Sequence, residues 1–170
     1  MEAKVSIVMG STSDLPVMEE SARILNDFGI PFEMHALSAH RTPNEVMAFA
    51  REAHSRGIRV IIAGAGGAAH LPGVIAALTP LPVIGVPIKA SISMDGWDSV
   101  LSILQMPPGI PVATVGLNAA QNAGLLAIQI LATGNEELMQ KFIAYKASLA
   151  KKITKANEEL KSVKFPFKTN

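Results

Sequence analysis

Short apolar runs alternate with longer segments of mixed apolar and polar residues along most of this chain. The short runs lie at 5–9, 32–37, 58–63, 83–86 and 112–115, and most are rich in valine and isoleucine. Such runs predict strands of a parallel sheet that is covered on both faces. Between them the pattern predicts helices from Ser13 or Asp14 to about Phe28, from Thr42 to about Arg56, and over 71–78, 97–105 and 118–133.

This alternation of strand and helix predicts the fold class. Five strand–helix units indicate an α/β protein, in which helices cover both faces of a mostly parallel sheet. We expect a three-layer α/β/α sandwich with a five-stranded parallel sheet, of the flavodoxin-like type. No linker, repeat or low-complexity stretch interrupts the pattern, so residues 1–170 are predicted to form a single domain.

The last part of the chain has a different pattern. From Glu136 onward, apolar residues recur every three or four positions, which predicts an amphipathic helix of about 25 residues. At about 1.5 Å per residue such a helix is nearly 40 Å long, which is longer than a small sheet needs. We therefore expect residues 135–170, including the tail Lys164–Asn170, to leave the body and pack on a neighbouring subunit.

Charged residues are almost missing from the middle of the chain. Residues 60–135 hold three charges, Lys89, Asp95 and Asp98, whereas residues 1–59 hold 14 and residues 136–170 hold 12. Glycine and proline interrupt this stretch too often for a membrane-spanning helix. We interpret it as core and as subunit contact, because a monomer would expose too much uncharged surface. The composition therefore predicts a large homo-oligomer.

The overall composition excludes several classes of function. The 15 basic and 14 acidic residues provide no net field for nucleic acid or an anionic membrane. The absence of cysteine excludes disulfides, thiol catalysis and cysteine metal sites, and fits a reducing compartment. The first ten residues do not resemble a signal peptide, because a short apolar run ends at Gly10. We expect a cytoplasmic protein.

Four loops rich in small or polar residues follow predicted strands, at 10–14, 38–43, 64–70 and 89–98. In open parallel sheets, ligands bind beyond the carboxyl ends of the strands, near a change in strand order. These loops therefore form the candidate site.

The loop Gly10–Asp14 leads into a predicted helix. Free backbone N–H groups and the helix dipole at that position favour an anion such as phosphate, which the Ser11 hydroxyl would also contact. Asp14 would repel phosphate but would accept hydrogen bonds from ribose hydroxyls. Ordinary helix capping by serine and aspartate explains the same residues, and the local sequence leaves both interpretations open.

The loop at 38–43 contains a cation, an imidazole and hydroxyl groups, from Arg41, His40, Ser38 and Thr42. Arg41 is suited to hold a phosphate through a forked contact, and His40 is a side chain that titrates near neutral pH. The alternative is a solvated loop whose arginine and histidine have no role in chemistry.

The loop at 64–70 has small residues that let its backbone approach a flat ligand, in particular Gly64, Ala65 and Gly66. It fits the G-x-G-x-x-[GA] pattern, but it does not follow the first strand and no acidic residue appears before Asp95, so a nicotinamide cofactor is not indicated. His70, at the edge of this loop, is either a second ligand contact or a helix cap, and both interpretations stay open.

Other motifs are missing from the sequence. No histidine pair has zinc spacing, no carboxylate cluster suggests magnesium, and neither a P-loop nor a G-x-S-x-G motif is present. The predicted site is thus a phosphate and ribose pocket with a glycine-lined slot and one histidine, without metal or cofactor. It suggests proton transfer on a small nucleotide-like substrate.

Several motifs together resemble one known family. These are GSTSD (10–14), SAHRTP (38–43), GAGGAAHLPG (64–73), GVP (85–87), DSVLSILQMPPGIPVATV (98–115) and NAGLLAIQIL (122–131). In this order and spacing, over about residues 4–160, they resemble the 5-(carboxyamino)imidazole ribonucleotide mutase family. That family is the catalytic subunit type of phosphoribosylaminoimidazole carboxylase.

The resemblance implies a purine-biosynthetic mutase that uses neither metal nor organic cofactor and assembles as a homo-octamer with sites at subunit junctions. It implies His40 as general acid/base. It implies substrate-binding roles for the residues that match the family motifs: Ser11, Asp14, Ser38, Arg41, the segment Gly64, Ala65 and Gly66, and His70.

Two stretches, Met94–Trp97 and Val115–Ala120, depart from the family pattern. Two other functions remain as alternatives. One is a carboxylase that adds free carbon dioxide to aminoimidazole ribonucleotide, and the other is a non-catalytic nucleotide-binding module.

Overall fold

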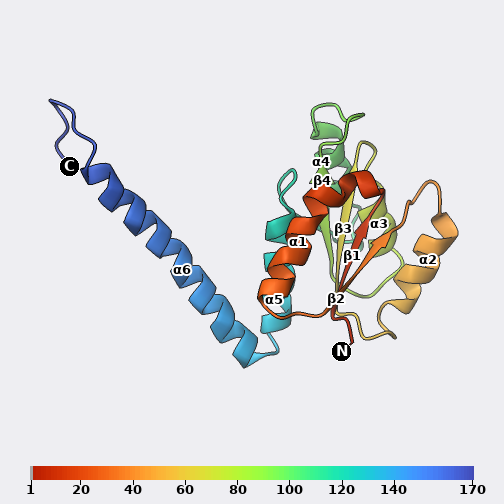
Figure 1. Ribbon diagram of the computed structural model, residues 1–170. Coiled ribbons are helices and arrows are strands. Elements are labelled where there is room, and N and C mark those ends of the chain that lie inside the picture. The colour runs from red at the N-terminus through yellow and green to blue at the C-terminus, as the bar shows by residue number, and fades with distance from the viewer. Residues whose placement is uncertain (1) are drawn as a thin grey trace.

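The computed structural model of the protein describes residues 2–170 (Figure 1). Five strands form one parallel sheet in the order β2-β1-β3-β4-β5. The strands are β1 (Val5–Met9), β2 (Phe32–Ala36), β3 (Val60–Gly66), β4 (Val83–Ile88) and β5 (Ala113–Thr114). The parallel sheet predicted from the apolar runs is confirmed, and its strand order is the flavodoxin-like one.

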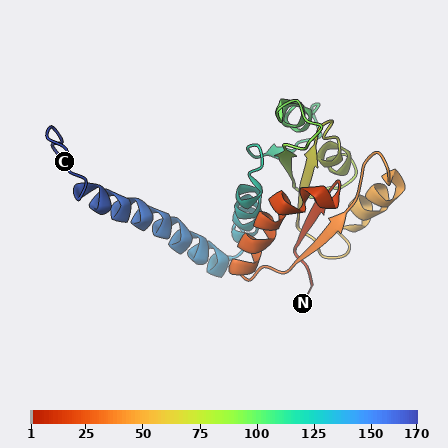
Figure 2. The same cartoon turned by 45° about the horizontal axis from the view of Figure 1, so that its top comes forward.

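Helices cover both faces of the sheet (Figures 1 and 2). One apolar core lies between the sheet and the helices α1 (Leu15–Asp27) and α5 (Ala120–Ala132). A second core lies on the opposite face, under α2 (Pro43–Glu52), α3 (Leu71–Ala76) and α4 (Trp97–Leu104). The predicted α/β/α sandwich is therefore confirmed.

The central strands are buried because both of their faces meet helices. All residues of β1 and of β4 are buried, including Ser6. Full burial of one Val, Ile or Leu side chain contributes about 1.5–3 kcal/mol to folding. Because both faces of these strands are buried, apolar residues follow one another along each strand, and the sequence shows runs rather than a period of two.

The boundaries of β3 differ from the prediction. The strand begins at Val60 rather than at Ile58 and continues through Gly66, so that Gly64–Gly66 belong to the sheet and not to a turn. These residues pair with residues 86–88 of β4. Glycine lowered their strand propensity in the sequence, but the pairing and the close packing of Met18 over Gly64 keep the strand regular.

Helix α2 ends earlier than predicted. It stops at Glu52 rather than near Arg56, and the next residues form turns up to Gly57. Gly57 has a φ of 91°, a left-handed conformation that glycine adopts without strain. His54 lies in this turn and is exposed.

Helix α6 (Glu136–Lys161) leaves the body of the molecule in both views (Figures 1 and 2). Asn135 caps it by accepting a hydrogen bond from the Leu138 N–H at 3.0 Å. Near its start it packs on α5, and Phe142 lies 6.0 Å from the Phe28 ring, centre to centre. Leu138 and Phe142 are its buried residues, so the projecting part carries its apolar side chains in the open.

No helix within residues 2–170 combines the length and the apolarity needed to cross a bilayer.

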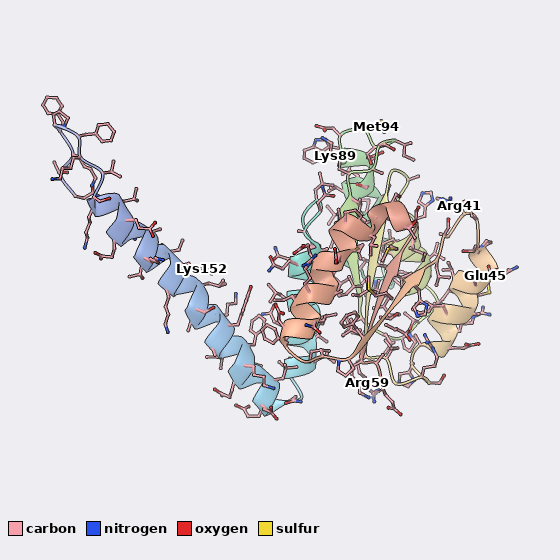
Figure 3. The ribbon with its side chains drawn as sticks, viewed as in Figure 1. Arg41, Glu45, Arg59, Lys89, Met94 and Lys152 are labelled. Atoms are coloured by element: carbon pink, nitrogen blue, oxygen red, sulfur yellow. The ribbon has the colours of Figure 1, made fainter. Side chains whose placement is uncertain are left out.

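The carboxyl ends of the strands all lie at one end of the sheet. Figure 3 shows Arg41, Lys89 and Met94 toward this end of the molecule and Arg59 at the opposite end. The loops that follow β1, β2, β3 and β4 therefore meet at a single place.

Candidate active site

The four loops that follow β1 to β4 enclose a cavity of about 500 Å³, which is large enough for a nucleotide-sized ligand. The cavity lies beyond β1 and β3, where the strand order changes direction, as expected for ligands of flavodoxin-like folds. The loops contribute lining residues as follows: Gly10, Ser11, Ser13 and Asp14; Ser38, Ala39, His40 and Arg41; Ala65, Gly66, Ala68, His70 and Leu71; and Ala90, Ser91 and Ile92.

The loop after β1 holds a serine and a buried carboxyl at the cavity. Ser11 caps the short helical turn Thr12–Asp14 through its Oγ, which accepts a hydrogen bond from the Ser13 N–H at 3.3 Å. Asp14 makes no side-chain capping bond to α1 and is 6% exposed. Helix capping therefore explains Ser11 but does not explain why a carboxyl group lines the cavity.

Burial raises the pKa of the Asp14 carboxyl above its ordinary value. Hydrogen bonds from the surrounding loop and the positive charge of Arg41 act against this rise. The cavity thus holds a carboxyl that has little contact with water, and such a group favours a ligand that brings hydrogen-bond donors.

Arg41 joins the loop after β2 to the loop after β1. Its Nη2 donates to the Gly10 carbonyl at 3.1 Å, and its Nε and backbone N–H donate to the Ser38 Oγ at 3.4 Å and 3.2 Å. Ser38 is itself fixed, because its N–H donates to the Thr42 Oγ1 at 2.9 Å. These hydrogen bonds therefore hold the guanidinium at the cavity.

Two histidines from different loops meet at the cavity. His40 Nε2 lies 2.7 Å from His70 Nδ1, and the rings stand edge to face, with an interplanar angle of 85°. One nitrogen must donate and the other must accept, so the tautomer of one ring sets the tautomer of the other. His70 occupies the N-cap position of α3 without a side-chain capping bond. Its ring contacts a second histidine, an option that neither sequence-based interpretation included.

The glycine-rich segment contributes differently along its length. Ala65 and Gly66 line the cavity, whereas Gly64 is buried beneath it and does not. A Cβ at Gly64 would lie 2.3 Å from the Met18 sulfur, and a Cβ at Gly66 would lie 2.6 Å from the Ala90 Cβ. These glycines allow close packing of the protein on itself, in addition to the ligand approach expected from the sequence.

The loop after β4 supplies three lining residues that the sequence did not single out, Ala90, Ser91 and Ile92. Ser93 holds this loop to the neighbouring one, because its Oγ accepts hydrogen bonds from the Gly67 and Ala90 N–H groups, each at 3.1 Å. The only signal in the sequence was the position of the loop after a strand, since small and apolar residues carry no chemistry that marks them.

No cluster of three or more His, Cys, Asp or Glu side chains in residues 2–170 is arranged to hold a metal ion. The cavity instead offers a guanidinium for an anion, a buried carboxyl for hydroxyl groups and a coupled imidazole pair for proton transfer.

The profile of the AIR carboxylase family matches residues 4–152. The chain belongs to the AIR carboxylase family. It is 60% identical to the N5-carboxyaminoimidazole ribonucleotide mutase of Pyrococcus abyssi over 146 residues, which are 86% of this chain and 83% of that protein. It is 53% identical to the phosphoribosylaminoimidazole carboxylase of Schizosaccharomyces pombe over 94% of this chain, but over 29% of that longer protein.

The AIR carboxylase fold is also found among solved structures. The crystal structure of Treponema denticola PurE matches with a TM-score of 0.82 and 31% sequence identity, over 94% of this chain and 99% of that chain. All four cavity loops fall inside the part that the AIR carboxylase family matches, whereas residues 153–170 lie outside it.

Proposed function

We propose that this protein is an N5-carboxyaminoimidazole ribonucleotide mutase of de novo purine biosynthesis. It moves the carboxylate of 5-(carboxyamino)imidazole ribonucleotide from the exocyclic nitrogen to carbon four of the same ring. The 60% identity to the Pyrococcus abyssi mutase supports this reaction. The observation that carries the proposal is the His40–His70 contact at a cavity that is also lined by Arg41 and the Ser11 loop.

The substrate is anchored by groups that lie away from the reacting atoms. Arg41 and the loop around Ser11 bind the phosphate, with the Ser38 hydroxyl alongside, and Asp14 accepts hydrogen bonds from the ribose. The imidazole ring lies against Ala65 and Gly66. Contacts of this kind use remote binding energy to hold the ring still during the reaction.

His40 is the general acid and base. The bond between the exocyclic nitrogen and its carboxylate breaks, carbon dioxide leaves, and His40 gives a proton to the nitrogen. Carbon four then attacks the trapped carbon dioxide, and His40 takes the proton that this carbon loses. One proton is given and one is taken back, so the histidine ends the cycle as it began.

We assign His70 to position His40 rather than to bind the substrate. The 2.7 Å contact couples the tautomer of His40 to that of His70 and holds the His40 ring in one orientation. Small and apolar lining residues, Ala65, Ala68, Ala90 and Ile92, provide the wall that retains carbon dioxide and keeps water out. No cofactor takes part in this sequence of steps.

We further propose that the protein is a cytoplasmic homo-octamer in which α6 packs on a neighbouring subunit. The lack of cysteine fits a reducing compartment. The exposed apolar side chains on the projecting part of α6, Leu149, Ile153 and Leu160, support a partner subunit as their cover.

The test is an isomerisation assay with the carboxyamino substrate, on the wild-type protein and on His40→Asn. We expect turnover by the wild type, and binding without turnover by the variant. Undiminished turnover by the variant would remove His40 from its role. Faster turnover of aminoimidazole ribonucleotide with bicarbonate would identify a carboxylase instead, and tight binding with no product from either substrate would identify a binding module.

A further inference from the structure

Five large apolar side chains are exposed on α4 and on the loop before it. They form what we call the α4 patch: Ile92, Met94, Trp97, Leu101 and Leu104, each more than half exposed. Met94 lies at the top of the main body in Figure 3, near Lys89. So many exposed large apolar side chains within residues 92–104 are unusual on a surface that faces only water, and they indicate an interaction site.

The residues after α6 carry a second exposed apolar group. Phe165 is 69% and Phe167 is 96% exposed, and Lys164 and Lys168 stand on either side of the pair. We call residues 163–168 the C-terminal tail. This segment lies beyond residue 152, where the match to the AIR carboxylase family model ends.

The tail does not reach the α4 patch of its own chain. Helix α6 is continuous over 26 residues, which is about 39 Å at about 1.5 Å per residue, and it carries the tail away from α4. Both views show this separation (Figures 1 and 2). If the tail covers such a patch, the patch must belong to a second copy.

The charges of the two segments are complementary. The tail contains two lysines and no acidic residue, whereas the segment from Ile92 to Leu104 contains two aspartates and no basic residue. Asp95 pairs with Lys89, while Asp98 accepts a hydrogen bond from the Met94 N–H at 3.1 Å and keeps a net negative charge beside the patch. A basic, aromatic segment matches this surface better than an acidic one does.

We propose that the C-terminal tail of one copy covers the α4 patch of a second copy, with Phe165 and Phe167 packed against Trp97. Ile92 belongs both to the patch and to the cavity lining, so the docked tail stiffens the outer wall of the second copy's site. The proposal rests on the self-association proposed above and does not depend on the reaction.

Trp97 reports on this contact, because it is the one tryptophan in the sequence. Acrylamide quenching of its fluorescence is measured for the wild type and for Phe165→Ser/Phe167→Ser. We expect the tail variant to be quenched several times more strongly and its emission to move to the red. Met47→Ser, which removes an exposed apolar side chain from α2, is the matched control and leaves quenching unchanged.

A mixing experiment shows whether the contact is between copies. The tail variant, which keeps Trp97, is unfolded and refolded together with a Trp97→Phe protein, which keeps the tail. We expect protection of Trp97 to return, because tails of the second protein cover patches of the first. The proposal would be overturned if Trp97 were quenched equally in the wild type and the tail variant. It would also be overturned if mixing did not restore the protection of Trp97.

Sedimentation of the same samples separates the two proposals. A tail variant that sediments as the wild type does but is quenched no more strongly rejects the tail contact alone. A wild type that sediments as a monomer rejects self-association itself, and the tail contact with it.

Discussion

The two imidazoles at the cavity act as a unit, because one hydrogen bond couples their tautomers. We predict that His70→Ala lowers kcat by about 100-fold, within the range that a general acid–base contributes, with little change in KM. His70→Asn retains a donor and an acceptor and should recover part of this loss. Steady-state kinetics and the pH profile of kcat measure both effects.

Arg41→Lys is the matched control for this pair of variants. It keeps the charge but loses the forked contact, so it should raise KM more than it lowers kcat. If His70→Ala instead raises KM with kcat unchanged, His70 binds the substrate and does not position His40.

The buried carboxyl of Asp14 lowers the stability of the folded protein at neutral pH but is proposed to bind the ribose of the substrate. Because its pKa is raised in the folded state, the folded protein binds more protons than the unfolded chain between the unfolded pKa, about 4, and the higher folded pKa. Stability therefore falls as the pH rises from the first of these values to the second. Asp14→Asn removes this penalty. We predict a higher Tm for the variant at neutral pH, together with a higher KM for the ribonucleotide.

The difference in Tm between the two proteins should disappear at pH values below about 4, where the carboxyl is protonated in both states. Thermal unfolding across this range measures it. A gain in stability that persists in acid would assign the effect to packing and not to charge.

Much of this site follows from the sequence, because polar groups that come directly after strands share one edge of the sheet. Ser11, Ser38 and Arg41 were predicted on that ground, and the structure brings them together at the cavity. The His40–His70 contact was not predictable, because no local pattern records the distance between two loops. The sequence pattern did not locate the end of β3, and Gly64 was therefore expected to line the cavity. It lies in the strand, below the cavity.

At the scale of the elements, β3 and the loop after β4 shape the cavity wall through their close approach. A methyl group at Gly66 would meet the Ile88 carbonyl oxygen at 2.9 Å, so the backbone must move, whereas one at Gly64 meets the flexible end of Met18. We predict that Gly66→Ala lowers both activity and stability, with a cost of about 1–3 kcal/mol. Gly64→Ala should lower stability less and leave activity largely intact.

Urea unfolding and the isomerisation assay compare the two variants. If the two variants lose equal amounts of activity, a backbone shift at Gly66 in the cavity wall harms the reaction no more than a side-chain shift beside Gly64 in the core. The site would then not depend on the position of the loop that contains Ala90.

The elements themselves were largely predictable, because apolar runs between helical segments specify buried parallel strands. Their ends were less so. Helix α2 stops at Glu52 and gives way to turns that lead to Gly57, whereas β3 continues into its glycines because they pair with β4. Local propensity is a weak guide where pairing or packing decides.

At the scale of the whole molecule, one part of the charge-poor middle of the chain is buried and another part is exposed. Strands β3 and β4 account for part of it and are buried in the sheet, as the sequence indicated. Trp97, Leu101 and Leu104 of α4 belong to the same stretch and are exposed in the single chain. Composition therefore predicted apolar surface without telling which part is core and which part is left for a partner.

Helix α6 makes the strongest case for assembly, because its apolar stripe continues after the helix has left the body. We predict that Leu149→Gln/Ile153→Gln dissociates the oligomer or lowers its order, as measured by analytical ultracentrifugation. Lys151→Gln/Lys155→Gln changes the opposite face of the same helix and is the matched control. Its sedimentation should equal that of the wild type, since an exposed ion pair such as Lys155–Glu159 contributes little to stability. If both pairs sediment as the wild type does, α6 is not a subunit contact, and solvent rather than a second copy faces its apolar stripe.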